Sequence, residues 1–365
     1  MAEYVQLVEQ GVVMEKLLES DDIVVDCVDP EHGVVVCHQR TAPYKIGYAY
    51  LGTFNPESVA GKSAINWTDL EHGQNILCAL QFPLFAFDIT GSHLGMRKDL
   101  QLFRVVHLLN DQVVSEGEMP TLCTGMTFDK QNRVWTADTA GFLYANTLNP
   151  PTVFQQQLPK GPGGKVQQAV ALTALPCRAD EASGVVAVTQ THVHVLYTTG
   201  AEIMSTPLPE DIQEKPPDIH IDIEGTKAGA ISVPSLDEVD HVWQIRCFEN
   251  CVVVLLQNSV LVKQSHQVQW LHIANLPCIM DAADLDGDGG LALSHMNGDV
   301  FIVYANSPDR APAVLTPRRD VVIGRKVGAN SHMLYAKKKD DMYHIYVARP
   351  EGMVDGTVYR PVEKK

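Results

Sequence analysis

The strongest constraint on this chain is a repeated unit of short β-rich segments. Each unit reads as a strand, a polar turn, a strand of small and β-branched residues, a turn with Gly or Asn, and a strand ending in an aromatic residue. These residue types favour strands and the turns between them. Seven such units occur, at residues 23–51, 76–108, 123–145, 169–204, 242–273, 279–315 and 332–359. Because helical periodicity is scarce, the sequence predicts an all-β fold.

The spacing of the units selects among all-β architectures. Successive units lie roughly 40 to 70 residues apart, and periods near 40 to 50 are typical of the four-stranded blades of a β-propeller. In such a ring each blade packs both faces against its neighbours, so few sheet edges stay free. We predict a single β-propeller domain over residues 1–365, with seven blades favoured and six as the alternative. Two β-sandwiches side by side are the rival architecture, since they also contain many short strands.

Two segments fall outside the repeat. The first is an insertion between blades, near residues 207–240, which begins in a Pro-rich acidic stretch and includes Asp218–Ile223. Strict alternation of isoleucine with polar residues there predicts an edge strand. The insertion is either a tolerated surface loop or a contact element on one rim. The second segment, residues 1–20, fits either a short amphipathic helix or a strand that closes the ring beside the last blade.

The distribution of charge argues against some partners. Lys and Arg total 28 and Asp and Glu total 44, a net charge of -16 that would repel a nucleic-acid backbone or an anionic lipid surface. Residues 310–365 nevertheless contain twelve Lys/Arg and six Asp/Glu, a net of +6, which leaves -22 for residues 1–309. We therefore expect no nucleic-acid partner, and an acidic body that carries a basic C-terminal segment.

Hydrophobic runs and cysteines bear on the compartment. The first residues have neither a basic region nor an apolar one, and no run approaches the roughly 18 apolar residues that a membrane span requires. The eight cysteines are spread singly through apolar stretches, which is typical of reduced, buried thiols. We expect no membrane insertion and a cytoplasmic location.

One loop has the spacing of a calcium site. Asp284, Asp286 and Asp288 occupy positions 1, 3 and 5 of a loop with glycine at position 6, and hard oxygen ligands at this spacing can bind Ca²⁺. Positions 9 and 12 are Ala292 and His295, so neither supplies a carboxylate. The sequence predicts at most weak Ca²⁺ binding, and an Asp/Gly hairpin without metal is the alternative.

This loop also resembles a known repeat. The Asp-x-Asp-Gly-Asp-Gly pattern and the strands after it, over residues 279–304, resemble one blade of FG-GAP propellers such as integrin α-chains and subunits of the Bardet-Biedl complex. Other units of this chain lack the carboxylates. The resemblance implies a propeller blade, and it suggests a subunit of a larger assembly.

A second unit resembles NHL-repeat proteins and the gluconolactonase and paraoxonase group. This unit, residues 123–145, is predicted to be a three-stranded antiparallel meander with tight turns at 129–132 and around 140–141. The resemblance is carried by Gly125–Asp129, Asn132–Asp138 and Gly141–Leu143. Those hydrolases hold a divalent cation on the ring axis, with an Asp or Asn just before the glycine of such a blade. This chain has Thr124 there, and no Glu-Gly-Pro motif occurs near its N-terminus. The resemblance supports the fold and argues against the activity.

One histidine pair could bind a metal. His192 and His194 lie in a predicted strand, so both imidazoles project from one face. A carboxylate partner is not identifiable, although Asp218, His220 and Asp222 are candidates. Two polar side chains on a blade face are the simpler interpretation. No phosphate loop, Gly-x-Ser-x-Gly or His-Glu-x-x-His motif is present.

These observations favour a non-catalytic β-propeller scaffold that mediates protein-protein interaction, as part of a larger assembly. The alternative is a metal-dependent hydrolase of lactonase or phosphotriesterase type with an axial divalent cation. We expect no cofactor other than weakly bound Ca²⁺. The residues predicted to contact a partner are Asp218, His220 and Asp222 in the insertion, and Arg318, Arg319, Arg325 and Lys326 in the basic segment.

Overall fold

The computed structural model covers most of the repeat units. It describes residues 5–6, 15–18, 23–29, 34–39, 45–50, 66–68, 85–88, 90–97, 101–108, 110, 112–148, 153–176, 183–197, 203–210, 220–221, 231–232, 240–265, 267–274, 276–287, 289–295, 300–306, 313–315, 332–339, 342–349 and 353–359. Side chains are described at 34, 36–39 and 45–48 and at the described positions from 85 to 306.

The described residues form β-sheets, antiparallel apart from one pair of strands, and one short 3₁₀ turn, η2 (Pro162–Gly164), with no α-helix. Six sheets contain four strands, a seventh contains five, and β19 (His220–Ile221) and β20 (Ile231–Ser232) form a two-stranded hairpin. Within these ranges no helix is long and apolar enough to span a bilayer.

The sheets follow one another along the chain. In each of the first three sheets the strands lie in sequence order. The first sheet contains β3 (Ile23–Asp29), β4 (Val34–Gln39), β5 (Ile46–Tyr50) and β6 (Asn66–Thr68), and the second contains β7 (Phe85–Phe87), β8 (His93–Arg97), β9 (Leu102–His107) and β10 (Gln112–Glu118). The third contains β11 (Cys123–Phe128), β12 (Val134–Asp138), β13 (Phe142–Asn146) and β14 (Val153–Gln157). The next two are β15 (Ala171–Ala174), β16 (Gly184–Val188), β17 (His192–Tyr197) and β18 (Ile203–Pro207); and β21 (Val242–Cys247), β22 (Cys251–Leu256), β23 (Val260–Gln264) and β24 (Leu271–Ile273).

The last two sheets each include a strand from the N-terminal segment. One contains β25 (Ile279–Asp284), β26 (Gly290–His295), β27 (Val300–Tyr304), β28 (Ala313–Leu315) and then β1 (Val5–Gln6), which pairs with β28 in parallel. The other contains β29 (His332–Lys339), β30 (Met342–Arg349), β31 (Met353–Tyr359) and then β2 (Glu15–Leu18), which pairs with β31 antiparallel. Residues 15–18 therefore form a strand rather than a helix.

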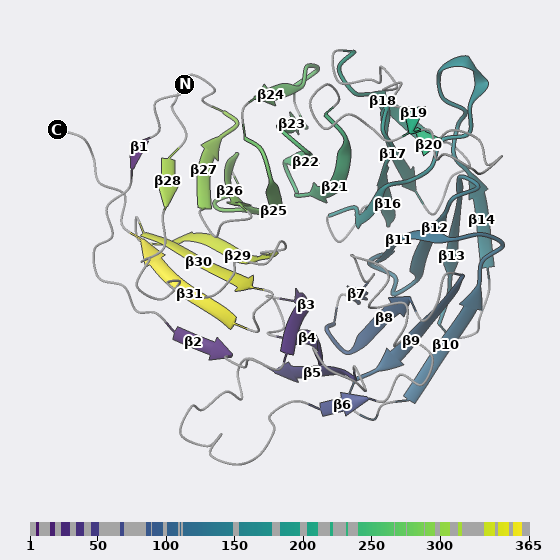
Figure 1. Cartoon of the computed structure of the whole chain (residues 1–365), viewed down its shortest axis with the longest axis horizontal. Coiled ribbons are helices and arrows are strands. Elements are labelled where there is room, and N and C mark those ends of the chain that lie inside the picture. Colours follow the sequence, from purple (N-terminus) through teal and green to yellow (C-terminus); the bar gives the residue numbers. More distant parts are fainter. Residues whose placement is uncertain are drawn as a thin grey trace.

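The sheets are arranged as a ring (Figure 1). The first strand of each sheet lies nearest the centre and contacts the first strand of the next sheet, from β3 through β7, β11, β15, β21 and β25 to β29, which contacts β3 again. The later strands lie progressively further out. This radial arrangement is the one that the repeat predicts, whereas the number of blades stays a prediction.

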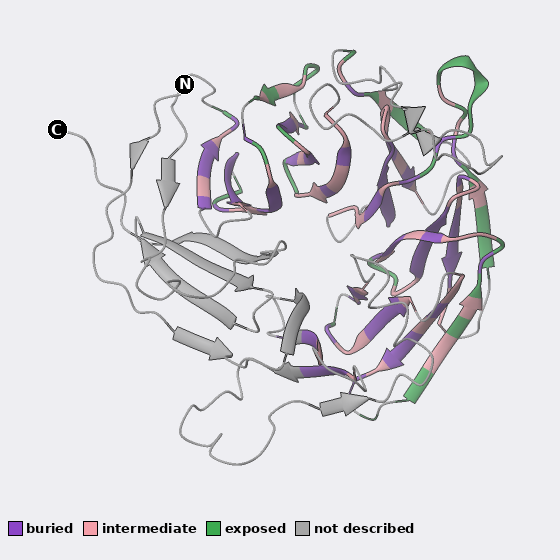
Figure 2. Cartoon of the chain, in the orientation of Figure 1, coloured by how far each residue is buried: buried purple, intermediate pink, exposed green. Residues whose placement is uncertain are grey.

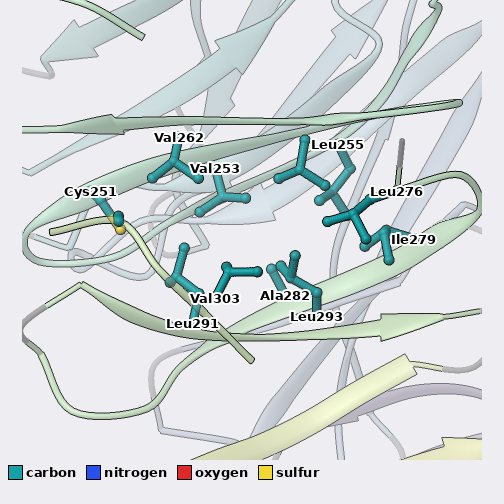
Figure 3. Close-up of a cluster of buried hydrophobic side chains, with 12 residues drawn as sticks. Cys251, Val253, Leu255, Val262, Leu276, Ile279, Ala282, Leu291, Leu293 and Val303 are labelled. Atoms are coloured by element: carbon teal, nitrogen blue, oxygen red, sulfur yellow. The ribbon is translucent and has the colours of Figure 1, made fainter. Parts of the chain in front are cut away.

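The hydrophobic core is divided among the interfaces between neighbouring sheets. Figure 3 shows one of these clusters, in which Val253 and Leu255 of β22 pack against Leu291 and Leu293 of β26. Since each sheet packs on both faces, central strands such as β12 and β16 are buried at every position. Burying one such aliphatic side chain contributes about 1.5 to 3 kcal/mol, so each interface stabilises the ring separately.

A shared turn device explains why acidic residues recur between the strands. At four hairpins an aspartate Oδ1 atom accepts a hydrogen bond from the backbone N–H four residues later, which fixes the tight turn. The pairs are Asp88 with Ser92 at 2.8 Å, Asp129 with Arg133 at 3.1 Å, Asp138 with Phe142 at 2.9 Å, and Asp286 with Gly290 at 3.0 Å. The two turns predicted at 129–132 and around 140–141 are confirmed.

Polar side chains also connect neighbouring sheets. Arg246 of β21 forms a bidentate ion pair with the buried Asp281 of β25, with N–O distances of 2.7 and 3.0 Å. The Gln190 amide exchanges two hydrogen bonds of 2.9 Å with the backbone of Val242. These contacts fix the relative positions of adjacent sheets, because each one satisfies groups on both sides of an interface.

Candidate functional site

The Asp284 loop uses its carboxylates within its own hairpin. Asp284 Oδ1 accepts a hydrogen bond of 3.0 Å from the N–H of Gly287, and Asp286 binds the N–H of Gly290 as described above. A Cβ atom at Gly290 would lie 2.7 Å from Asp286 Oδ2, so the carboxylate fits closely against the glycine backbone. Burial raises the pKa of Asp284, which disfavours its charged form. Asp288 lies outside the described residues.

We expect Ca²⁺ to bind this loop weakly. Two of its carboxylates already accept backbone hydrogen bonds, so the dissociation constant should be about 10⁻⁴ to 10⁻³ M, the range of loosely held sites. Calorimetric titration of the wild type with CaCl₂ measures it, and the Asp286→Ala variant is the matched control. Submicromolar affinity that disappears in Asp286→Ala would contradict this expectation.

The position that matches the axial ligand of the lactonase-like hydrolases is occupied by Thr124. Its side chain is half-buried at the start of β11, and Oγ1 has no hydrogen-bond partner among the described residues. Beside it, burial raises the pKa of the Cys123 thiol to about 12, so this cysteine stays protonated. In the described part of the chain, no group of three or more His, Cys, Asp or Glu side chains has metal-binding geometry.

The His192 and His194 rings lie on the same face of β17, as predicted. They stack with centroids 5.7 Å apart and an angle of 15° between the planes. His194 is fully buried, and both of its ring nitrogens have protein partners, Ser205 Oγ at 2.9 Å and Gln167 Oε1 at 3.3 Å. A metal ion could reach His194 only by displacing one of these contacts.

Gln167 is the centre of this buried polar cluster. Its Oε1 atom also accepts hydrogen bonds from the hydroxyls of Thr189 at 2.6 Å and Thr191 at 3.1 Å. Burial, followed by repulsion from His192, lowers the pKa of His194 to about 4, so its imidazole is neutral at pH 7. The geometry therefore indicates a structural network that anchors the 158–170 segment to β17.

The predicted contact residues fall mostly outside the described structure. Asp218, Asp222, Arg318, Arg319, Arg325 and Lys326 all lie there, and only the backbone is described for His220, which pairs with Ser232. The predicted edge strand is present in part, as β19, and β20 is its partner. The candidate metal partners of the histidine pair, Asp218, His220 and Asp222, are among these residues, so their side chains are not described.

Sequence reasoning missed a set of exposed apolar side chains, four of them on outer strands and two between strands. Large apolar side chains are exposed at Val113, Val153, Phe154, Val166, Met204 and Val268. Three of these six lie between residues 153 and 166, on β14 and in the hairpin after it, and Figure 2 shows this outer edge largely exposed. The sequence signal for β14 was weak, because only its place directly after the predicted three-stranded meander marks the uncharged segment Val153–Gln157 as a strand.

Comparisons with known proteins bear on the fold. No protein-family model matches the chain, and no curated protein matches its sequence. Among solved structures, the propeller domain of Cps50 (Swd1) from Myceliophteria thermophila superposes with a TM-score of 0.55 at 9% identity, over 95% of this chain and 99% of that one. The chain is a β-propeller. This result confirms the predicted fold class.

A second similar structure belongs to a longer protein. The extracellular domain of BT4673 from B. thetaiotaomicron, assigned to the hybrid two-component systems, superposes with a TM-score of 0.54 at 13% identity over 99% of this propeller. The propeller spans 40% of that chain. At these identities the likeness shows the fold, and function has to be argued from the surface of this propeller itself.

Proposed function

We propose that this propeller is a non-catalytic scaffold that holds proteins together in a larger assembly in the cytoplasm. The observation that carries the proposal is where the carboxylates and the exposed apolar side chains of the described residues lie. The described buried carboxylates, such as Asp88, Asp129 and Asp281, are engaged in turns or between sheets, while apolar side chains are exposed on the outer strands. Exposed apolar surface on a rigid frame is typical of interaction sites.

The insertion and the basic C-terminal segment are the contacts that we propose from sequence. An edge strand of the kind predicted at Asp218–Ile223 can pair with an extended segment of a partner. Arg318, Arg319, Arg325 and Lys326 would attract an acidic partner, so association should slow as salt shortens the screening length below the roughly 10 Å of 0.1 M salt.

A deletion tests this placement. Residues 211–239 are replaced by a Gly/Ser linker, which keeps Pro207, whose carbonyl accepts a hydrogen bond from Trp270, and Asp240, which binds the N–H of Asn258. We expect affinity purification from a cell extract to lose the partners that the wild type retains. If the deleted protein melts cooperatively and recovers the same partners, the insertion is only a loop.

A further inference from the structure

Strand β14 is an open edge of the ring. Among the described strands it is the outermost of its sheet and pairs only with β13, in the register Tyr144 with Gln155. The N–H of Leu158 donates to the carbonyl of Gly141 at 2.8 Å, which sets the alternation of bonded and non-bonded pairs. By that alternation the backbone groups of Val153, Gln155 and Gln157 point away from β13, and no strand in the described ranges pairs with them.

The side chains of β14 suit an extended partner. Val153 is 68% exposed and Phe154 is 46% exposed. The Phe154 ring lies edge-on to the ring of the buried Trp135, with the two ring centroids 6.3 Å apart. Trp135, Ala145 and Phe154 are successive cross-strand neighbours, so Phe154 is held in place by the sheet below it. A partner strand can therefore form backbone hydrogen bonds with β14 and pack an apolar side chain against the Phe154 ring.

The other outer strands that the structure describes are protected against such pairing. β10 carries Glu116 and Glu118 and a bulge, and β6 and β24 have only three residues each. In β18 the backbone of Pro207 faces outward and has no N–H, and its carbonyl already accepts a hydrogen bond from Trp270 Nε1. β1 and β2 are the outermost strands of the last two sheets; β1 has only two residues, and β2 has four, two of them charged, and an irregular register. β14 has five residues, no charge, no proline and no bulge.

The charge around β14 indicates the charge of the partner that would fit there. Residues 139–178 contain no Asp or Glu in a chain that has 44 of them, and they include Lys160 and Lys165. Both lysines are exposed on the hairpin that follows β14, and neither forms an ion pair with another described residue. The backbone of this hairpin is closed by a hydrogen bond of 2.8 Å from the N–H of Gly161 to the carbonyl of Lys165. A second copy of this edge would bring like charges together.

We propose that β14 and the lysine hairpin, residues 160–166, bind an extended acidic segment of a partner protein by strand addition. The segment pairs with the outward backbone groups of Val153, Gln155 and Gln157, and its carboxylates lie near Lys160 and Lys165. The proposal deepens the scaffold function and rests on it, but it concerns a surface separate from the insertion.

Displayed random peptides of about twelve residues, long enough for one strand, are the probe. They are selected on the wild-type protein, and the binders are synthesised and their dissociation constants measured by fluorescence anisotropy. We expect the selected peptides to be enriched in Asp and Glu over the starting library. No binders, or binders without this enrichment, would overturn the proposal.

Two matched pairs of variants locate the contact. Gln155→Pro removes an outward N–H without touching the β13 ladder, because proline is tolerated at such edge positions, and Gln155→Thr is its control. We expect Gln155→Pro to weaken binding at least about tenfold and Gln155→Thr to leave it within about twofold. Reversing both lysines, Lys160→Glu with Lys165→Glu, should weaken binding by about tenfold, whereas Lys130→Glu on another exposed turn should not.

Hydrogen exchange keeps the test independent of the folding of the variants. Bound peptide should slow amide exchange in residues 153–157 of the wild type. Protection elsewhere, or equal binding to wild type and Gln155→Pro, would show that the peptides bind another surface, and the scaffold function would stand without this edge. Concentration-dependent dimers of the wild type that Gln155→Pro abolishes would overturn the choice of partner.

Discussion

Replacing Asp129 with alanine should lower the free energy of unfolding by about 3 to 5 kcal/mol. The Asp129 side chain is fully buried and accepts four hydrogen bonds, from the backbone N–H groups of Gln131 and Arg133, from Arg133 Nε at 2.7 Å and from Trp135 Nε1 at 2.8 Å. Removing the carboxylate leaves the guanidinium and the indole unpaired inside the protein, and leaving a buried donor unpaired is costly.

Urea unfolding followed by tryptophan fluorescence measures this loss. Asp129→Asn keeps one acceptor oxygen but turns the other into a donor facing Arg133 and Trp135, so its effect should fall between those of the wild type and the alanine variant. Glu118→Ala, on the exposed outer strand β10, is the control and should change the free energy of unfolding by less than about 0.5 kcal/mol. A loss below about 1 kcal/mol in Asp129→Ala would show that water replaces the carboxylate.

Acidification should destabilise the propeller through His194. Its pKa is lowered to about 4 in the folded protein, mainly by burial, against about 6.5 in an unfolded chain. Between these two values the unfolded state binds one more proton than the folded state. The free energy of unfolding therefore falls as the pH falls from 6.5 to 4, by about 3 kcal/mol from this residue, and this contribution changes no further below pH 4.

The His194→Gln variant isolates this contribution. Glutamine cannot titrate but can still form hydrogen bonds, so its stability should fall less steeply over the same pH window, once other groups common to both proteins are subtracted. Urea unfolding of both proteins at half-unit steps between pH 4 and pH 7 gives the two slopes. Parallel curves would mean that His194 is protonated in the folded state as readily as in the unfolded chain.

The sequence predicted what depends on local chemistry. The turns at Asp129 and Asp138 are set by an aspartate and the amide four residues later, and both groups lie within one hairpin. The same locality made the Asp286 loop resemble a calcium site, because an Asp/Gly hairpin and a metal loop use the same residues. The sequence also predicted that the His192 and His194 side chains share one face, because side chains alternate between the two faces along a strand.

Pairings between distant segments were harder to predict. Residues 1–20 fitted a helix or a strand, because the partners of their two strands, β28 and β31, lie far away in the sequence. β14 was missed, because five residues without a charge or a strong pattern become a strand only through their register with β13. Its role as an open edge became visible only when the other outer strands could be compared with it.

The pairing of β2 with β31 has a consequence for biosynthesis. Lys16 and Asp355 are register partners, so a strand that is synthesised before the intervening sheets completes a sheet whose other three strands are synthesised after them. The sheets between them can form in order as the chain emerges, since their strands are neighbours in sequence. Ring closure, in contrast, depends on the most distant contacts in the chain, and contacts of that kind form slowly. Until the ring closes, β2 has no partner in the completed sheet, and β14 is an outer strand already formed to which it could pair wrongly.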